Sequence, residues 1–169
     1  MATHELGHVL VAWGTGGTVT RVVLHPLAIS RTDVEPNRCP LWVAWGGPIA
    51  GVLVPLLMWG SLAGGPQCVR AMARSFAGFC LIANGAYLSV GSLDRVGDAG
   101  ELLQHGAPTW LLWAWGAVTI PLGLWCWHGI GDHFGFGAAA GDVETRCVML
   151  STVLLFAVLA LCVLCSPTR

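Results

Sequence analysis

Long apolar runs alternate with short polar stretches along most of this chain. A helix needs about 20 apolar residues to cross roughly 30 Å of hydrocarbon. Four ranges reach that length, and each carries at most one charged side chain: 40–63, 71–91, 108–130 and 147–165. This pattern predicts four full membrane spans.

The first apolar range, residues 1–13, is shorter than the others. At about 1.5 Å of rise per residue it provides only about 20 Å of helix. We expect it to be a truncated first span that lacks its front part. The stretch 14–39 follows, and its alternating β-branched residues predict a short β-hairpin. The expected fold is an all-α, polytopic membrane protein, with about five transmembrane helices in a single domain over residues 1–169.

Composition supports a membrane setting. Charged residues make up 10% of the chain and hydrophobic residues 55%, with a mean hydropathy of +0.70. An ordinary soluble domain has about 25% charged residues, and a disordered chain has low hydrophobicity. The eight basic residues form no stripe, which argues against a nucleic-acid partner. We expect a multi-pass integral protein of the cell (plasma) membrane, with the lipid bilayer around it.

Cysteine usage agrees with this class. The seven cysteines are an odd number and lie mostly inside apolar runs. Secreted domains with disulfide frameworks have an even number at regular spacing. The sequence therefore predicts no such framework.

Candidate chemistry begins at the fourth residue, with the motif H-E-x-x-H formed by His4, Glu5 and His8. Residues four apart lie on one face of a helix, so both imidazoles can bind one zinc ion. Glu5 lies beside that face and can act as a general base towards water at the metal. Three ionisable groups in an apolar helix are costly without a function. The alternative is a polar helix start near the membrane interface.

A catalytic zinc ion usually has three protein ligands and one water. Asp98 and Asp94 are the two candidates for the third ligand, because both follow the span 71–91 on the side of the membrane where the motif helix ends. Each has a plainer interpretation. Asp98 and Glu101 have the spacing of a capping box that opens a short helix, and Asp94 could be a solvated turn residue.

Three segments together resemble the site-2 protease family of intramembrane zinc metalloproteases. The sequence H-E-L-G-H at 4–8 matches the family's H-E-x-x-H. The sequence G-G-P-I-A-G at 46–51 is similar to the small-residue segment that opens the family's next core helix. Asn84, followed by Asp98, Ala99 and Gly100, is similar to the region that supplies the family's third ligand.

The resemblance implies a zinc-dependent intramembrane endopeptidase. Its substrates would be membrane-anchored proteins, cut within or near the membrane. His4, His8 and Asp98 would bind Zn²⁺, and Glu5 would be the catalytic base.

Two further residues are candidates for substrate contact. Gly47 could give the substrate access beside the metal, although a glycine pair before a proline is also typical of close helix packing. Asn84 could hold the substrate backbone or polarise the scissile carbonyl. An interhelical hydrogen bond is the alternative for Asn84.

Two other function classes fit the same sequence. A catalytically silent relative could act as a binding module for membrane proteins, and it would need no metal. A small transporter could use histidine and aspartate to pass metal ions or protons, and it would produce flux without proteolysis. The sequence indicates no oligomeric state.

Overall fold

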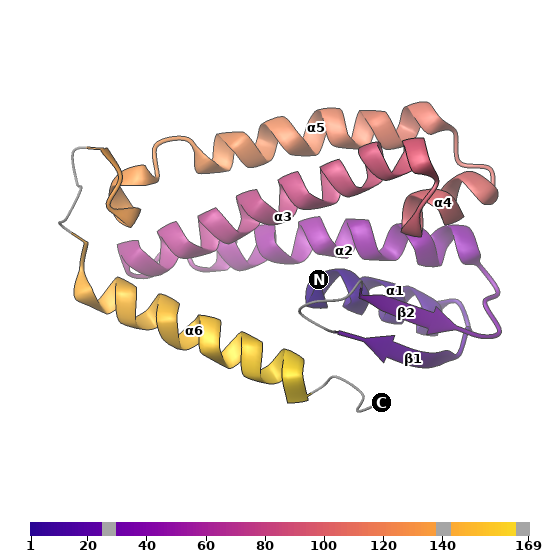
Figure 1. The fold of residues 1–169 in the computed structure, drawn as a ribbon, viewed down its shortest axis with the longest axis horizontal. Coiled ribbons are helices and arrows are strands. Elements are labelled where there is room, and N and C mark those ends of the chain that lie inside the picture. The colour runs from indigo at the N-terminus through magenta and orange to yellow at the C-terminus, as the bar shows by residue number, and fades with distance from the viewer. Residues whose placement is uncertain (25–29, 138–142, 165–169) are drawn as a thin grey trace.

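The computed structural model describes residues 1–24, 30–137 and 143–164 of the chain (Figure 1). Its elements are, in order, α1 (Ala2–Gly14), β1 (Val19–Val23), β2 (Arg31–Val34), α2 (Pro40–Ser61), α3 (Gln67–Asp94), α4 (Gly97–Gln104), α5 (Thr109–Trp127), the 3-10 helix η1 (Gly131–Phe134) and α6 (Thr145–Leu164).

Three long helices, α2, α3 and α5, form the body of the molecule (Figure 1). The α1 helix packs against α2, the two strands pack against α1, and the short α4 helix packs against α2 and α3. These three long helices are each apolar enough to cross a membrane. The fold is therefore mostly helical and consistent with a membrane protein.

The predicted spans 40–63, 71–91 and 108–130 correspond to α2, α3 and α5. The other two predicted spans, 1–13 and 147–165, also form helices. However, α1 has only 13 residues, and the apolar part of α6 is Thr145–Leu161, so both apolar segments are shorter than a full membrane crossing. The number of about five spans is therefore not confirmed. Cys165, which ends the predicted range 147–165, lies outside the described residues.

The predicted β-hairpin is confirmed. Strands β1 and β2 pair in antiparallel fashion, with Val22 opposite Thr32 and Val23 opposite Arg31. β-Branched residues, which favour extended backbone, occupy most of these positions. Both strands contact α1, so the hairpin lies directly over the helix that carries the H-E-x-x-H motif.

Glycines allow α1 and α2 to approach backbone to backbone. A Cβ atom on Gly7 would collide with the carbonyl oxygen of Gly46. A Cβ atom on Gly46 would lie 2.7 Å from the carbonyl oxygen of Gly7 and 2.8 Å from Val11 Cγ2. Small residues at such positions are the usual means by which membrane helices pack closely. The motif helix is thus held against α2 at a distance that only glycine permits.

The α4 helix is fixed by apolar packing. Its residues Ala99 and Leu102 are fully buried and belong to a cluster drawn from four helices and the turn after α4. The other members of this cluster are Ala44, Leu88, Ala107 and Leu112. Burial of these side chains holds the first turn of α4 at the end of α3.

One disulfide joins Cys68, at the start of α3, to Cys147, in the first turn of α6. The pattern of cysteines did not predict this pair. The two residues are 79 positions apart, and only tertiary packing brings them together. Together with a contact between Ser151 and Met72, the disulfide attaches α6 to α3.

The close approach of α1 and α2 leads to a stability prediction. Gly46→Ala should lower the melting temperature in detergent, because overpacking a tight interface costs about 1–3 kcal/mol. Gly60→Ala, in the same helix, is the matched control, since a Cβ atom there has no neighbour within 4 Å. Thermal unfolding of both variants checks this. Equal melting temperatures would contradict the tight contact.

Candidate functional site

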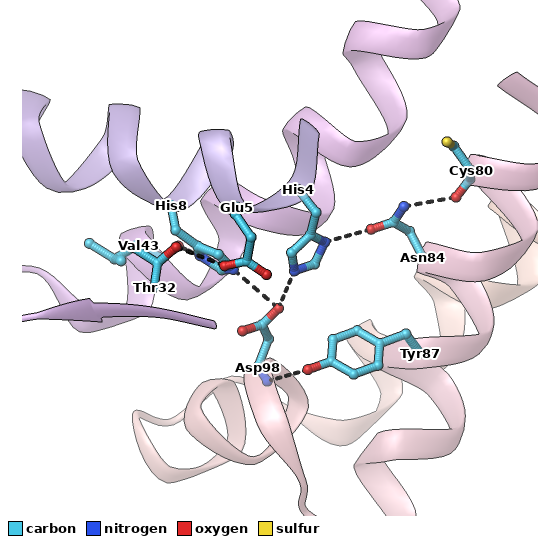
Figure 2. Close-up of polar contacts among 9 residues, drawn as sticks. All are labelled: His4, Glu5, His8, Thr32, Val43, Cys80, Asn84, Tyr87 and Asp98. Carbon is cyan, nitrogen blue, oxygen red and sulfur yellow. Dashed lines mark hydrogen bonds and ion pairs between the residues drawn. The ribbon is translucent and has the colours of Figure 1, made fainter. Parts of the chain in front are cut away.

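The three motif residues project from one face of α1 into the interior (Figure 2). Glu5 is 4% exposed and His8 is 6% exposed. Gly47 of α2 lies directly beneath both imidazoles, because a Cβ atom there would collide with His8 and lie 2.7 Å from His4 Nε2. Because glycine has no side chain, position 47 leaves the space that the two histidine rings occupy.

Each histidine is oriented through its Nδ1 atom. His8 Nδ1 donates a hydrogen bond to the backbone carbonyl of Val43 at 2.7 Å. His4 Nδ1 donates to Asn84 Oδ1 at 2.8 Å, and the amide nitrogen of Asn84 donates to the carbonyl of Cys80 at 2.8 Å. A carbonyl oxygen can only accept, so both Nδ1 atoms carry a proton. The Nε2 atom of each ring is then free to bind a metal ion.

Asp98 of α4 completes the cluster. Its Oδ2 atom lies 2.7 Å from His4 Nε2 and 3.4 Å from His8 Nε2. One ligand atom from each of the three residues lies within 4.8 Å of the others. With Nδ1 protonated, both Nε2 atoms and the carboxylate carry lone pairs that face one another. Only a cation between them, a proton or a metal ion, makes this arrangement favourable.

The electrostatics of Asp98 suit a ligand. Burial by itself would raise the pKa of this carboxyl, but the hydrogen bonds and charge of the facing His4 and His8 imidazoles, in their protonated form, outweigh burial and bring its pKa down to about 2. Asp98 therefore stays ionised at every physiological pH. An ionised carboxylate is the form that binds metal ions.

The backbone at Asp98 is positioned by Tyr87 of α3. The Asp98 amide donates a hydrogen bond to the Tyr87 hydroxyl at 3.2 Å, and the Tyr87 ring packs edge-on to His4. The preceding residue, Gly97, has a φ of +55°, and a Cβ atom there would collide with the Tyr87 hydroxyl. Both its conformation and its contact require glycine.

Tertiary structure distinguishes the two candidate aspartates. The α4 helix begins at Gly97, with Val96 as its N-cap and no side-chain cap. Asp98 is therefore not a capping residue, because its side chain faces the histidines instead. Asp94 is the exposed last residue of α3 and does not belong to the cluster.

Gly47 and Asn84, the two candidates for substrate contact, both lie next to the histidines. Gly47 makes room for the imidazoles, and Asn84 uses both ends of its amide on His4 and Cys80. The interhelical hydrogen bond considered for Asn84 is therefore present. Direct contact of either residue with a substrate stays a prediction.

The sequence alone did not identify three hydrogen-bond partners of the site residues. These are the Val43 carbonyl, the Tyr87 hydroxyl and the Thr32 hydroxyl, which contact His8, the Asp98 amide and Glu5 in turn. Tyr87 could have been found, because it is three residues after Asn84 and so shares its helix face. The contacts of Val43 and Thr32 could not be predicted from the local sequence pattern, because their partners lie 35 and 27 residues away along the chain.

A cavity of about 820 Å³ opens over the cluster. Its walls include the motif residues, strand β2 and the neighbouring ends of α3 and α4. Among the wall residues outside the cluster are the polar or charged side chains of Arg31, Glu35, Asn37 and Glu101. Water and a polar backbone can therefore reach the three ligand atoms.

No protein-family model, no curated protein and no solved structure matches this chain. The chemistry that the chain can perform is therefore indicated by the geometry of its own residues.

The cluster predicts which aspartate binds a metal ion. A zinc ion held by the cluster should be lost in Asp98→Ala, because a site with two ligands holds the ion weakly. Asp94→Ala should keep it, since Asp94 lies outside the cluster. Elemental analysis of detergent-purified protein measures the content. Loss of zinc from the Asp94 variant alone would overturn the assignment.

A second prediction concerns the orientation of His4. Asn84→Leu removes the acceptor for Nδ1–H and should weaken zinc binding about 10- to 100-fold. Asn84→Asp keeps an acceptor at that place and should preserve affinity. Competition with a chelator of known affinity measures both variants. Equal weakening in the two would show that the acceptor has no role.

Proposed function

We propose that this chain is a zinc-dependent intramembrane endopeptidase that hydrolyses peptide bonds of membrane-embedded or membrane-proximal proteins. One observation carries the proposal: the Nε2 atoms of His4 and His8 converge on the Asp98 carboxylate, next to the buried carboxylate of Glu5. Three ligands beside a general base form the minimal arrangement of a metallopeptidase.

The donor set supports zinc. Two imidazole nitrogens and one carboxylate oxygen suit a tetrahedral zinc site with an open fourth position. Calcium and magnesium prefer sites made of oxygen ligands, so the two imidazoles disfavour them. Hydrogen bonds from both Nδ1 atoms add the outer-shell orientation that catalytic zinc sites commonly have.

A zinc ion bound at this place would supply Lewis-acid chemistry, acidifying water and polarising a peptide carbonyl. Glu5 takes one proton from the attacking water as the water oxygen bonds to the carbonyl carbon. Glu5 then delivers that proton to the leaving nitrogen as the C–N bond breaks. The products are a new carboxyl group and a new amine, and Glu5 returns to its starting state.

The surroundings support a membrane substrate. The α2, α3 and α5 helices are long and apolar enough to lie in a bilayer, and the walls of the cavity over the cluster include polar and charged side chains. Ionisable groups at membrane depth need such a polar, water-accessible space. A multi-pass protein of the plasma membrane, cutting membrane-anchored substrates, is the setting that we propose.

The decisive variant is Glu5→Gln. It should retain zinc, because Glu5 is not one of the three converging ligands, and it should lose at least about 100-fold in cleavage, since glutamine cannot accept the proton. Wild type and variant are reconstituted in liposomes with native single-span membrane proteins. Mass spectrometry then detects new amino termini in or near the transmembrane segments.

The same preparation separates the other function classes. Cleavage retained by Glu5→Gln would overturn the mechanism. A folded wild type that holds no zinc and produces no new amino termini would indicate a silent binding module. Zinc passage across the liposome membrane without proteolysis would indicate a transporter.

A further inference from the structure

The carboxylate of Glu5 is held by a residue of the hairpin. Thr32 Oγ1 donates a hydrogen bond to Glu5 Oε2 at 2.7 Å. Within residues 1–24, 30–137 and 143–164, no other side chain donates to this carboxylate, and no arginine forms an ion pair with it. Thr32 is thus the described partner that determines where a nearly fully buried carboxylate points.

The direction of the Thr32 hydroxyl is set by the sheet. Thr32 belongs to β2 and lies opposite Val22 of β1. Its β-branched side chain has few rotamers on a paired strand. The hydroxyl therefore reaches Glu5 only while β2 is seated against α1.

Position matters more for Glu5 than for an ordinary buried side chain. A glutamate side chain has three rotatable bonds, and a general base must lie within hydrogen-bond reach of the proton that it removes. His4 is fixed by Asn84 and His8 by Val43, but neither contact restrains Glu5. The hydrogen bond from Thr32 restrains this carboxylate at Oε2, and no described side chain donates to Oε1.

We propose that Thr32 is the positioning residue of Glu5. Through Thr32, the β1–β2 hairpin would hold the catalytic carboxylate in its reactive position. This inference rests on the proposed peptidase function. Lifting the hairpin away from α1 would leave His4, His8 and Asp98 in place but would release the base. Zinc binding and catalysis would then respond differently to the same change.

Kinetics test the positioning role. Thr32→Val keeps the shape of the side chain but removes the hydroxyl, and it should lower kcat about 10- to 100-fold with little change in KM. Thr32→Ser restores the hydroxyl and should recover most of kcat. Thr15→Val is the control, because the hydroxyl of Thr15, the residue after α1, donates to carbonyls of that helix and lies outside the cavity wall. Zinc content should stay at the wild-type level in all three variants.

Hydrogen exchange tests the contact without any cleavage assay. Protection of the hairpin amides should fall about tenfold in Thr32→Val and in Glu5→Ala, because a hydrogen bond to a buried carboxylate is lost in each. The double variant should lose no more than either single one. Additive losses would show that the two side chains do not interact.

The outcomes separate the inference from the function on which it rests. A wild type that binds zinc but never cleaves overturns the proposed function, whatever the exchange data show. A cleaving wild type matched by an equally active Thr32→Val overturns the inference alone. A drop in kcat that Thr32→Ser does not rescue also overturns it, because the hydroxyl would then not be the group that matters.

Discussion

The contact between α1 and α2 is the constraint on which the rest of the site depends. Gly7, Gly46 and Gly47 have no side chains at the crossing, so the two backbones come close enough for the imidazoles to lie against α2. At that distance the Val43 carbonyl is within hydrogen-bond reach of His8. A wider crossing would leave His8 Nδ1 without this acceptor and its Nε2 without a fixed direction.

Buried polar groups in an apolar protein must find partners, and here they find them mainly in the backbone. Val43 provides a carbonyl for His8, Cys80 provides one for Asn84, and the Asp98 amide is bound by Tyr87. The first two of these bonds satisfy groups that would be costly to bury alone. The bond to Val43 also orients His8, and Asn84 in turn orients His4, so the same hydrogen bonds that satisfy buried polar groups set the directions of the two rings of the candidate metal site.

The residues of the candidate site come from elements that are held in place in different ways. Asp98 lies on α4, whose Ala99 and Leu102 are fully buried, and the histidines lie on a helix clamped by glycines. Thr32 comes from a two-stranded hairpin that packs against α1. A two-stranded sheet is marginally stable by itself. Glu5, the general base of the proposed mechanism, thus has its described side-chain partner on a two-stranded hairpin.

Much of this protein could be predicted from the sequence, where the pattern is local. Apolar runs of sufficient length marked α2, α3 and α5, alternation of β-branched residues marked the hairpin, and the spacing of His4 and His8 placed both on one helix face.

Residues far apart along the chain were brought together only by tertiary structure. His4 and Asp98 are 94 residues apart, and their positions after the span 71–91 did not distinguish Asp98 from Asp94; only the resemblance of Asp98, Ala99 and Gly100 to a family motif favoured Asp98. The choice depends on how α4 packs against α2 and α3. Tertiary packing also brings together Cys68 with Cys147 and Thr32 with Glu5. The periodicity of a sequence shows which face of a helix or strand is buried, but it does not show which residue of another element lies opposite that face.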